Sequence, residues 1–220
     1  MKRRHAIAAF GTVVVGLAGC FEADAPEDDP DPVTEEPRID EPPYAITEPD
    51  PPGDPDGDYD ELYLGRAMPT DPSRSFRRLS DARLRSDARR LTDLDAAEEF
   101  HVRAVTDDET RAATFDTDDA ASREAVESVD LDESTLVVVE SGYGSGSIRH
   151  RFRRAEATDD GIHLHGFYTQ PFVQTDDYTS RDSTIAVDVS PPGLVRVSLT
   201  VAPDRRVHFN STEGVVTVED

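Results

Sequence analysis

Residues 195–201 read Val-Arg-Val-Ser-Leu-Thr-Val, with an apolar residue at every second position and a polar one between. Side chains of a β-strand point alternately to its two faces, so this stretch predicts a strand with one face in a core. Residues 136–139 read Leu-Val-Val-Val, which is typical of a central strand covered on both faces. Similar short runs predict further strands at 148–152, 162–165, 185–189, 207–209 and 216–218.

Turn-forming pieces separate these strands, such as Asp-Asp-Gly at 159–161 and Ser-Pro-Pro-Gly at 190–193. About seven short strands at this spacing predict an antiparallel β-sandwich or barrel. The preceding residues are mixed. They predict strands at 61–68 and 99–105, short helices at 107–115 and 118–129, and a weakly helical segment at 74–94. The expected fold class is mostly β (α+β), with one or two short helices in a single domain at 59–220.

The chain is strongly acidic. Acidic residues outnumber basic ones by 47 to 23, the formal net charge is −24, and Lys2 is the only lysine. This charge repels phosphates, which excludes nucleic acids as expected partners. In molar salt the Debye length falls to about 3 Å, so such a surface stays soluble there. The preference for Arg over Lys and the abundant Asp resemble proteins of haloarchaea. The alternative is an acidic protein of ordinary salt with a disordered tail.

The N-terminus has the features of an export signal. A charged start at residues 2–5 precedes an apolar run at 6–16 that is too short to span about 30 Å of hydrocarbon comfortably. Residues 17–20, Leu-Ala-Gly-Cys, then resemble the lipobox of bacterial and archaeal lipoproteins at all four positions. The resemblance implies a signal peptide at 1–19 and a lipid on the sulfur of Cys20. It places the protein at the cell membrane, facing the extracellular side.

Two further features of this region bear on export. Arg3 and Arg4 resemble the twin-arginine signal, although Ala6 stands where that motif favours a large apolar residue. The general secretory route is therefore the alternative. Cys20 is the only cysteine, so it cannot form an intramolecular disulfide.

Residues 21–58 are unlike the rest of the chain. They contain fifteen acids, one base and ten of the sixteen prolines. Such a segment cannot bury enough apolar surface to offset its chain entropy. We therefore expect residues 20–58 to be a disordered, acidic, proline-rich tether that carries the lipidated cysteine.

The most unusual loop is glycine-rich and comprises Gly142, Tyr143, Gly144, Ser145, Gly146 and Ser147. A strand rather than a helix is predicted after it, which excludes a P-loop or a dinucleotide fingerprint. We interpret it as a hairpin connection that needs positive φ angles, with a binding loop as the alternative. The region from about 107 to 202, including this loop, resembles the C-terminal β domain of PrcB-type protease-complex proteins. That resemblance implies a fold and no activity.

His163 and His165 lie two apart on a predicted strand, so their imidazoles share one face at metal-ligand distance. Residues 166–170, Gly-Phe-Tyr-Thr-Gln, lack the glutamate that a cupin would add. We therefore expect a solvated polar face, no cofactor and no metal. Arg149, Arg151 and Arg153 form a basic stripe, which we expect to pair with carboxylates; an anionic ligand is the alternative.

Asn210-Ser211-Thr212 is an N-glycosylation sequon in a chain with no other asparagine. No nucleophile elbow or other catalytic signature is present. The sequence thus predicts a monomeric, membrane-anchored surface lipoprotein whose β module binds a surface protein or a small ligand without catalysis. A secreted enzyme or a solute-binding transporter subunit is the alternative.

Overall fold

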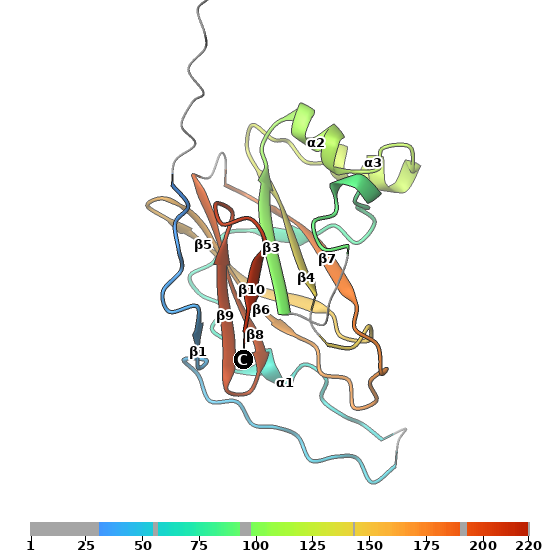
Figure 1. Ribbon diagram of the computed structural model, residues 1–220, viewed down its shortest axis with the longest axis vertical. Coiled ribbons are helices and arrows are strands. Elements are labelled where there is room, and N and C mark those ends of the chain that lie inside the picture. Colours follow the sequence, from blue (N-terminus) through green and yellow to red (C-terminus); the bar gives the residue numbers. More distant parts are fainter. Residues whose placement is uncertain (1–30, 55–56, 93–97, 143, 190–192, 220) are drawn as a thin grey trace, which may run out of the picture. The chain divides into compact units, whose positions relative to one another are not determined.

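The computed structural model describes residues 31–54, 57–92, 98–142, 144–189 and 193–219. Residues 31–220 form one compact unit. Its two five-stranded sheets pack face to face as a sandwich (Figure 1). The first sheet has the strand order β1 (Ile39–Asp40), β9 (Arg205–Asn210), β8 (Leu194–Ala202), β6 (Gly161–Tyr168) and β5 (His150–Thr158). The second has the order β10 (Val216–Val218), β3 (Glu98–Val105), β4 (Thr135–Gly142), β7 (Ser180–Val187) and β2 (Phe76–Arg78).

The predicted mostly β sandwich is confirmed. All seven strands expected after residue 134 are present as β4 to β10, and the strand expected at 99–105 is β3. Strand pairs are antiparallel except β6 and β8, which are parallel neighbours. A parallel pair needs a long crossover connection, and here the chain supplies it by passing through β7 of the opposite sheet.

The main core lies between the sheets. Phe100 of β3 and Phe209 of β9 meet there with ring centroids 5.3 Å apart. A second apolar cluster covers the outer face of the second sheet and includes Phe115 and Val126 beside the short helices. Because both faces of β4 are covered, its residues are all buried, as the apolar run at 136–139 predicts.

The two predicted short helices are present as α2 (Asp108–Thr114) and α3 (Ala120–Glu127). The Asp107 carboxylate accepts a hydrogen bond from the backbone N–H of Thr110, and Asp119 caps α3 in the same way through Ser122. These side chains occupy N–H groups that have no partner within a helix. Both helices therefore begin where an acidic residue can cap them.

Two local predictions are wrong. Residues 61–68, expected as a strand, contain the helical turn α1 (Tyr63–Arg66), which buries Tyr63 and Leu64; a Cβ at Gly65 would clash with Phe167 of β6. Residues 74–92, expected to be weakly helical, contain β2 and a single 3₁₀ turn at Ser86–Ala88. Leu79 and Leu84 are spaced to cover the outer face of the second sheet rather than to form a helix face. Leu94 lies outside the described residues.

The predicted tether extends too far. Residues 31–46, here called the strap, belong to the domain, and their strand β1 pairs with the edge strand β9. The strap's charges have specific partners. Asp40 pairs with Arg206, Glu35 with Arg196, and Arg38 with Glu213. Arginines of β8 and β9 neutralise Glu35 and Asp40, so these ion pairs help to hold a segment that has little apolar surface to bury. Residues 20–30 of the predicted tether lie outside the described residues.

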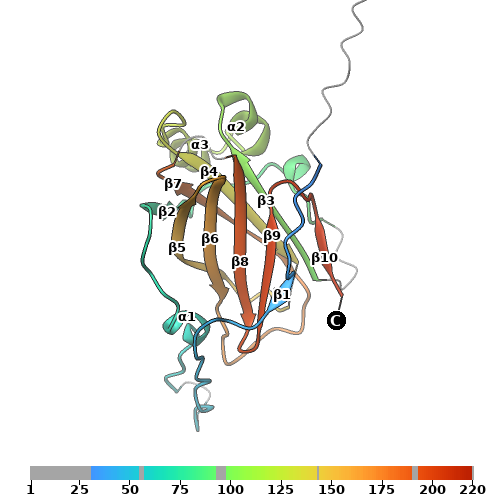
Figure 2. The same cartoon turned by 90° about the vertical axis from the view of Figure 1, so that its left-hand side faces the viewer.

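The first sheet has two distinct ends, which are about 25 Å apart for strands of eight residues. At the strap end, Gly161 and Leu194 begin the parallel pair, and the backbone N–H of Val33 donates to Thr212. The opposite end, here called the loop end, carries the glycine-rich loop and α1 (Figure 2). The strap therefore enters the domain at the end remote from that loop.

We expect Gly161→Ala to destabilise the domain by about 3 kcal/mol or more. Gly161 has a φ of +156°, and a Cβ there would lie 1.8 Å from the carbonyl oxygen of Leu194. That oxygen belongs to the paired strand β8, so relief would require separating β6 from β8. Urea denaturation measures the change. Gly53→Ala, where a Cβ meets nothing within 4 Å, is the control. Equal stabilities of the two variants would contradict the prediction.

Candidate functional site

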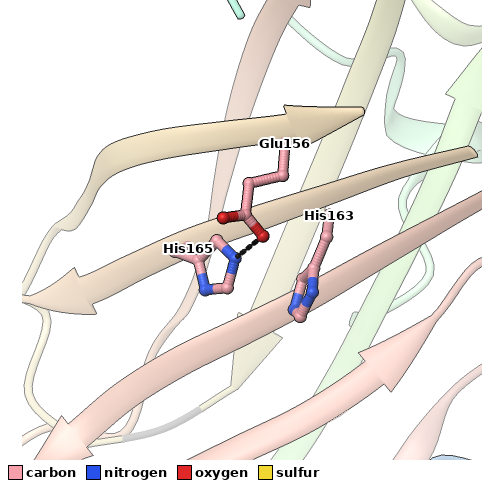
Figure 3. Close-up of side chains that lie close together, drawn as sticks. All are labelled: Glu156, His163 and His165. Carbon is pink, nitrogen blue, oxygen red and sulfur yellow. Dashed lines mark hydrogen bonds and ion pairs between the residues drawn. The ribbon is translucent and has the colours of Figure 1, made fainter. Parts of the chain in front are cut away.

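Three potential ligand side chains converge on the outer face of the first sheet (Figure 3). His163 and His165 project from β6 on the side opposite to the buried Ile162 and Leu164, and Glu156 projects beside them from β5. One ligand atom from each of the three lies within 4.8 Å of the other two. The ring centroids of the two histidines are 4.0 Å apart. This group is here called the histidine–glutamate cluster.

The β5–β6 hairpin positions the cluster. Its register places Glu156 directly opposite His163, and Arg154 directly opposite His165. Glu156 therefore reaches His165 diagonally, with Oε2 3.2 Å from Nε2. The Arg154 guanidinium lies against both, with Nε 3.2 Å from a Glu156 oxygen and Nη2 3.1 Å from His165 Nε2.

A hydrogen-bonded chain extends from His163 across the sheet to the strap. Ser198 Oγ of β8 lies 2.7 Å from His163 Nε2 and 2.8 Å from His208 Nδ1 of β9. His208 Nε2 in turn lies 2.9 Å from a carboxylate oxygen of Asp40. Asp40 also accepts two hydrogen bonds from Arg206, which hold the pKa of its carboxyl below the usual range. The orientation of the His163 ring is thus linked to the strap.

Burial keeps both histidines of the cluster neutral at neutral pH. It lowers the pKa of His163 to about 3, helped by the neighbouring His165 ring. It lowers the pKa of His165 to about 3 as well, helped by the charge of Arg154. A neutral imidazole keeps one nitrogen lone pair, which can accept a hydrogen bond or ligate a metal.

The prediction of a solvated polar face is wrong for this region, because His165 is only 8% exposed. The strap lies over this face, where the Tyr44 hydroxyl is hydrogen-bonded to Thr200. Glu156 is more exposed than His165, with 24% of its side chain accessible. A surface pocket of about 450 Å³ lies beside Glu156 and is lined by Pro72, Ser73, Arg74, Ala155, Glu156 and Ala157.

Sequence reasoning paired the two histidines but sought the carboxylate in the wrong place, just after His165. Glu156 precedes both histidines and reaches them across the hairpin. A usable signal was present. A two-residue turn at Asp159 and Asp160 pairs Thr158 with Gly161 and so brings residue 156 opposite residue 163. Ser198, His208 and Asp40 had no comparable local signal.

Ser198, His208 and Asp40 are the residue types of a hydrolase triad, but the geometry does not suit one. Ser198 is 2% exposed, and its hydroxyl lies between two imidazoles. It sits within β8, which pairs with β6 on one side and β9 on the other. The backbone N–H groups around it therefore serve the sheet rather than a developing oxyanion. The chain of hydrogen bonds orients side chains and offers no accessible nucleophile.

The glycine-rich loop connects β4 of the second sheet to β5 of the first, so the predicted hairpin connection is wrong. Gly144 has the expected positive φ, 59°. The backbone N–H of Gly146 donates to Asp177 and that of Ser147 to the Ser145 hydroxyl. Both donors are therefore occupied by protein groups. Tyr143 lies outside the described residues.

The loop's carbonyl groups are held by arginines. Arg181 donates to the carbonyls of Gly144 and Ser145, and Arg149 to that of Gly146. Within the described parts of the chain, Arg149, Arg151 and Arg153 form no ion pair, contrary to expectation. Arg78 of β2 lies near two of them. Burial is the main cause that lowers the pKa of Arg78, and the positive charge of Arg151 lowers it further.

Asn210 is fully buried at the end of β9. Its Nδ2 donates to the Val33 carbonyl and to Glu35, while its Oδ1 accepts from the backbone N–H and hydroxyl of Thr212. A glycan on Nδ2 would have to replace the contacts that attach the strap. The folded domain thus uses Asn210 as a structural residue, and the geometry does not favour its glycosylation.

The comparisons with known proteins add no relative. The chain matches no protein-family model, no curated protein and no solved structure. The roles considered below therefore depend on its own residues.

Proposed function

We propose that this chain is an exported lipoprotein, anchored through Cys20, whose sandwich is a non-catalytic binding module on the extracellular side of the cell membrane. The observation that carries the proposal is the position of Cys20 relative to the domain. The lipobox-like residues 17–20 end eleven positions before Asp31, where the compact unit begins. A chain of eleven residues spans at most about 40 Å. An anchor on Cys20 would hold the domain close to the bilayer.

The loop end of the module supports a binding role. It exposes apolar surface at Leu62, Phe172 and Val173, with relative exposures of 41%, 44% and 67%. A surface pocket beside Tyr59 and Phe172 adds a concave element there. Exposed apolar side chains around a hollow are typical of binding surfaces.

Two structural features support binding over the alternatives. Residues 31–220 form one compact unit, whereas a solute-binding subunit would use two lobes around a cleft. Ser198 is hydrogen-bonded to His208 but is enclosed within the sheet, so it is not an accessible nucleophile for an enzyme.

No helix among the described residues is long and apolar enough to cross a membrane.

The anchor can be tested by expressing the full chain in a haloarchaeal host and separating membranes from the medium. We expect the wild-type chain in the membrane fraction, released only by detergent. Cys20→Ser should remove the lipid and its mass, so that the chain leaves the membrane or keeps its uncleaved signal. Gly19→Ala, which keeps a small residue beside Cys20, is the matched control and should stay lipidated. Wild-type chain recovered without lipid from the cytosol, with residues 1–19 attached, would refute the proposal.

A further inference from the structure

We propose that Glu156, His163 and His165 bind one divalent first-row transition metal ion of the zinc class on the outer face of the first sheet. Two imidazole nitrogens and one carboxylate oxygen form a donor set that suits such ions. The donors come from directly paired strands of one hairpin, so they are already aligned in the folded chain. The site goes beyond anchoring and needs no lipid.

The spacing is close to that of a bound ion. The three ligand atoms lie within 4.8 Å of one another. Bonds of about 2.0–2.2 Å in a tetrahedral site place ligands roughly 3.5 Å apart, so shifts of about 1 Å would close the cluster on an ion. Three protein ligands leave one position for water. The Glu156 side chain is 24% exposed, so solvent reaches the cluster at this ligand.

The surrounding hydrogen bonds are those expected of a ligand histidine. His163 uses Nε2 toward Ser198, which leaves Nδ1 as its ligand atom. The chain through His208 ends on the Asp40 carboxylate, and such outer contacts orient the ring and raise its basicity. Losing an outer partner of a metal ligand commonly weakens metal binding by about 10- to 100-fold. Ser198→Ala should therefore weaken binding to that extent and leave its stoichiometry unchanged.

Arg154 is the competitor for this site. Its guanidinium carries a positive charge within 3.2 Å of Glu156 and 3.1 Å of His165, where it stabilises the cluster without a metal. An ion can bind only when this side chain withdraws. One of its nitrogens already lies 3.4 Å from the Asp71 carbonyl, toward the segment that lines the pocket. Arg154→Gln should therefore raise metal affinity at least tenfold, an effect that a purely structural cluster would not produce.

The test is calorimetric titration of Zn²⁺ into the full chain in detergent and molar KCl, after stripping with EDTA. The chain carries no polyhistidine tag and has Cys20→Ser, because a free thiol also binds zinc. We expect one ion per chain. His163→Gln, His165→Gln and Glu156→Gln should each abolish binding. His101→Gln is the matched control, since His101 faces Glu140 and Arg103 in a cluster without a second histidine.

Circular dichroism shows which variants remain folded, and Arg154→Gln decides the question if the ligand variants do not fold. No binding by either the wild-type chain or Arg154→Gln at stoichiometric zinc would overturn the proposal. Stoichiometric binding that survives His163→Gln and His165→Gln in folded protein would overturn it as well.

Discussion

We expect acidification from pH 7 to pH 4 to unfold the domain, because folding buries histidines in their neutral form. His150 is the clearest case. Its ring lies between Ser141 and Ser183 in the core and stacks on Tyr168. Burial, with the charges of Arg181 and Arg78, lowers its pKa to about 3. The unfolded chain binds this proton near pH 6.5, whereas the folded chain excludes it.

The sign and size follow from this difference in proton binding. A base with a depressed folded pKa contributes its full stability above the unfolded pKa of 6.5 and loses it as the pH falls toward 3. The loss is about 1.4 kcal/mol per pH unit for each such group. His163 and His165 shift in the same direction, so at pH 5 the three together remove about 6 kcal/mol, comparable to the stability of a typical domain.

Far-ultraviolet circular dichroism in molar KCl with EDTA measures the acid midpoint, which we expect between pH 4 and 5. His150→Gln removes one titrating group and should make the acid transition less steep, even where it lowers the stability at pH 7. An intact β spectrum at pH 3.5 would contradict the burial of three neutral histidines.

Glu140→Gln has the second large effect, a loss of about 3–5 kcal/mol, because it removes the ion-pair partner of the largely buried Arg103 guanidinium. Glu140 is 3% exposed on β4, forms an ion pair with Arg103 of β3 and lies 3.3 Å from the His101 ring nitrogen Nδ1. Burial alone would raise the pKa of Glu140. The contacts with His101, the backbone N–H of Arg90 and Arg103 outweigh burial, so the pKa is lowered and the carboxylate stays charged. Burial also lowers the pKa of Arg103, which donates a hydrogen bond to the Ala88 carbonyl.

Urea denaturation at pH 7 and constant salt measures this change, since urea leaves the ionic strength unaltered. Glu127→Gln on α3 makes the same substitution at an exposed position and should change the stability by less than about 0.5 kcal/mol. A loss below 1 kcal/mol for Glu140→Gln would contradict the prediction. It would mean that the attraction between Glu140 and its partners only offsets the free-energy cost of removing these charges from water.

Local patterns predicted the elements that local physics controls. Alternation at 195–201 and the apolar run at 136–139 were confirmed as β8 and β4. The helices predicted at 107–115 and 118–129 were confirmed as α2 and α3, each of which follows an acidic N-cap. Prediction failed where a segment's role depends on what it covers. Residues 74–92 and α1 place apolar side chains against sheets, and spacing along the chain does not reveal a partner that is distant in sequence.

The strap and the candidate site show the same limit. Asp40 contacts Arg206 and His208, which lie more than 160 positions away in the sequence. The sequence therefore shows the charge of Asp40 but not its partners. His163 and His165 were correctly placed on one face by their spacing of two. Their carboxylate partner followed from the register of the β5–β6 hairpin, which the turn at Asp159 and Asp160 sets.

By itself, the sequence determined the strands from residue 135 onward, the acidic charge and the position of Cys20, whose lipidation stays a prediction. The tertiary structure alone decided that the strap joins the domain, that Asn210 is buried, and that Ser198, His208 and Asp40 connect to the histidine–glutamate cluster. The physical reason is that backbone preference and amphipathic period act over a few neighbouring residues. Burial, ion pairing and ligand geometry depend instead on which distant strands become neighbours.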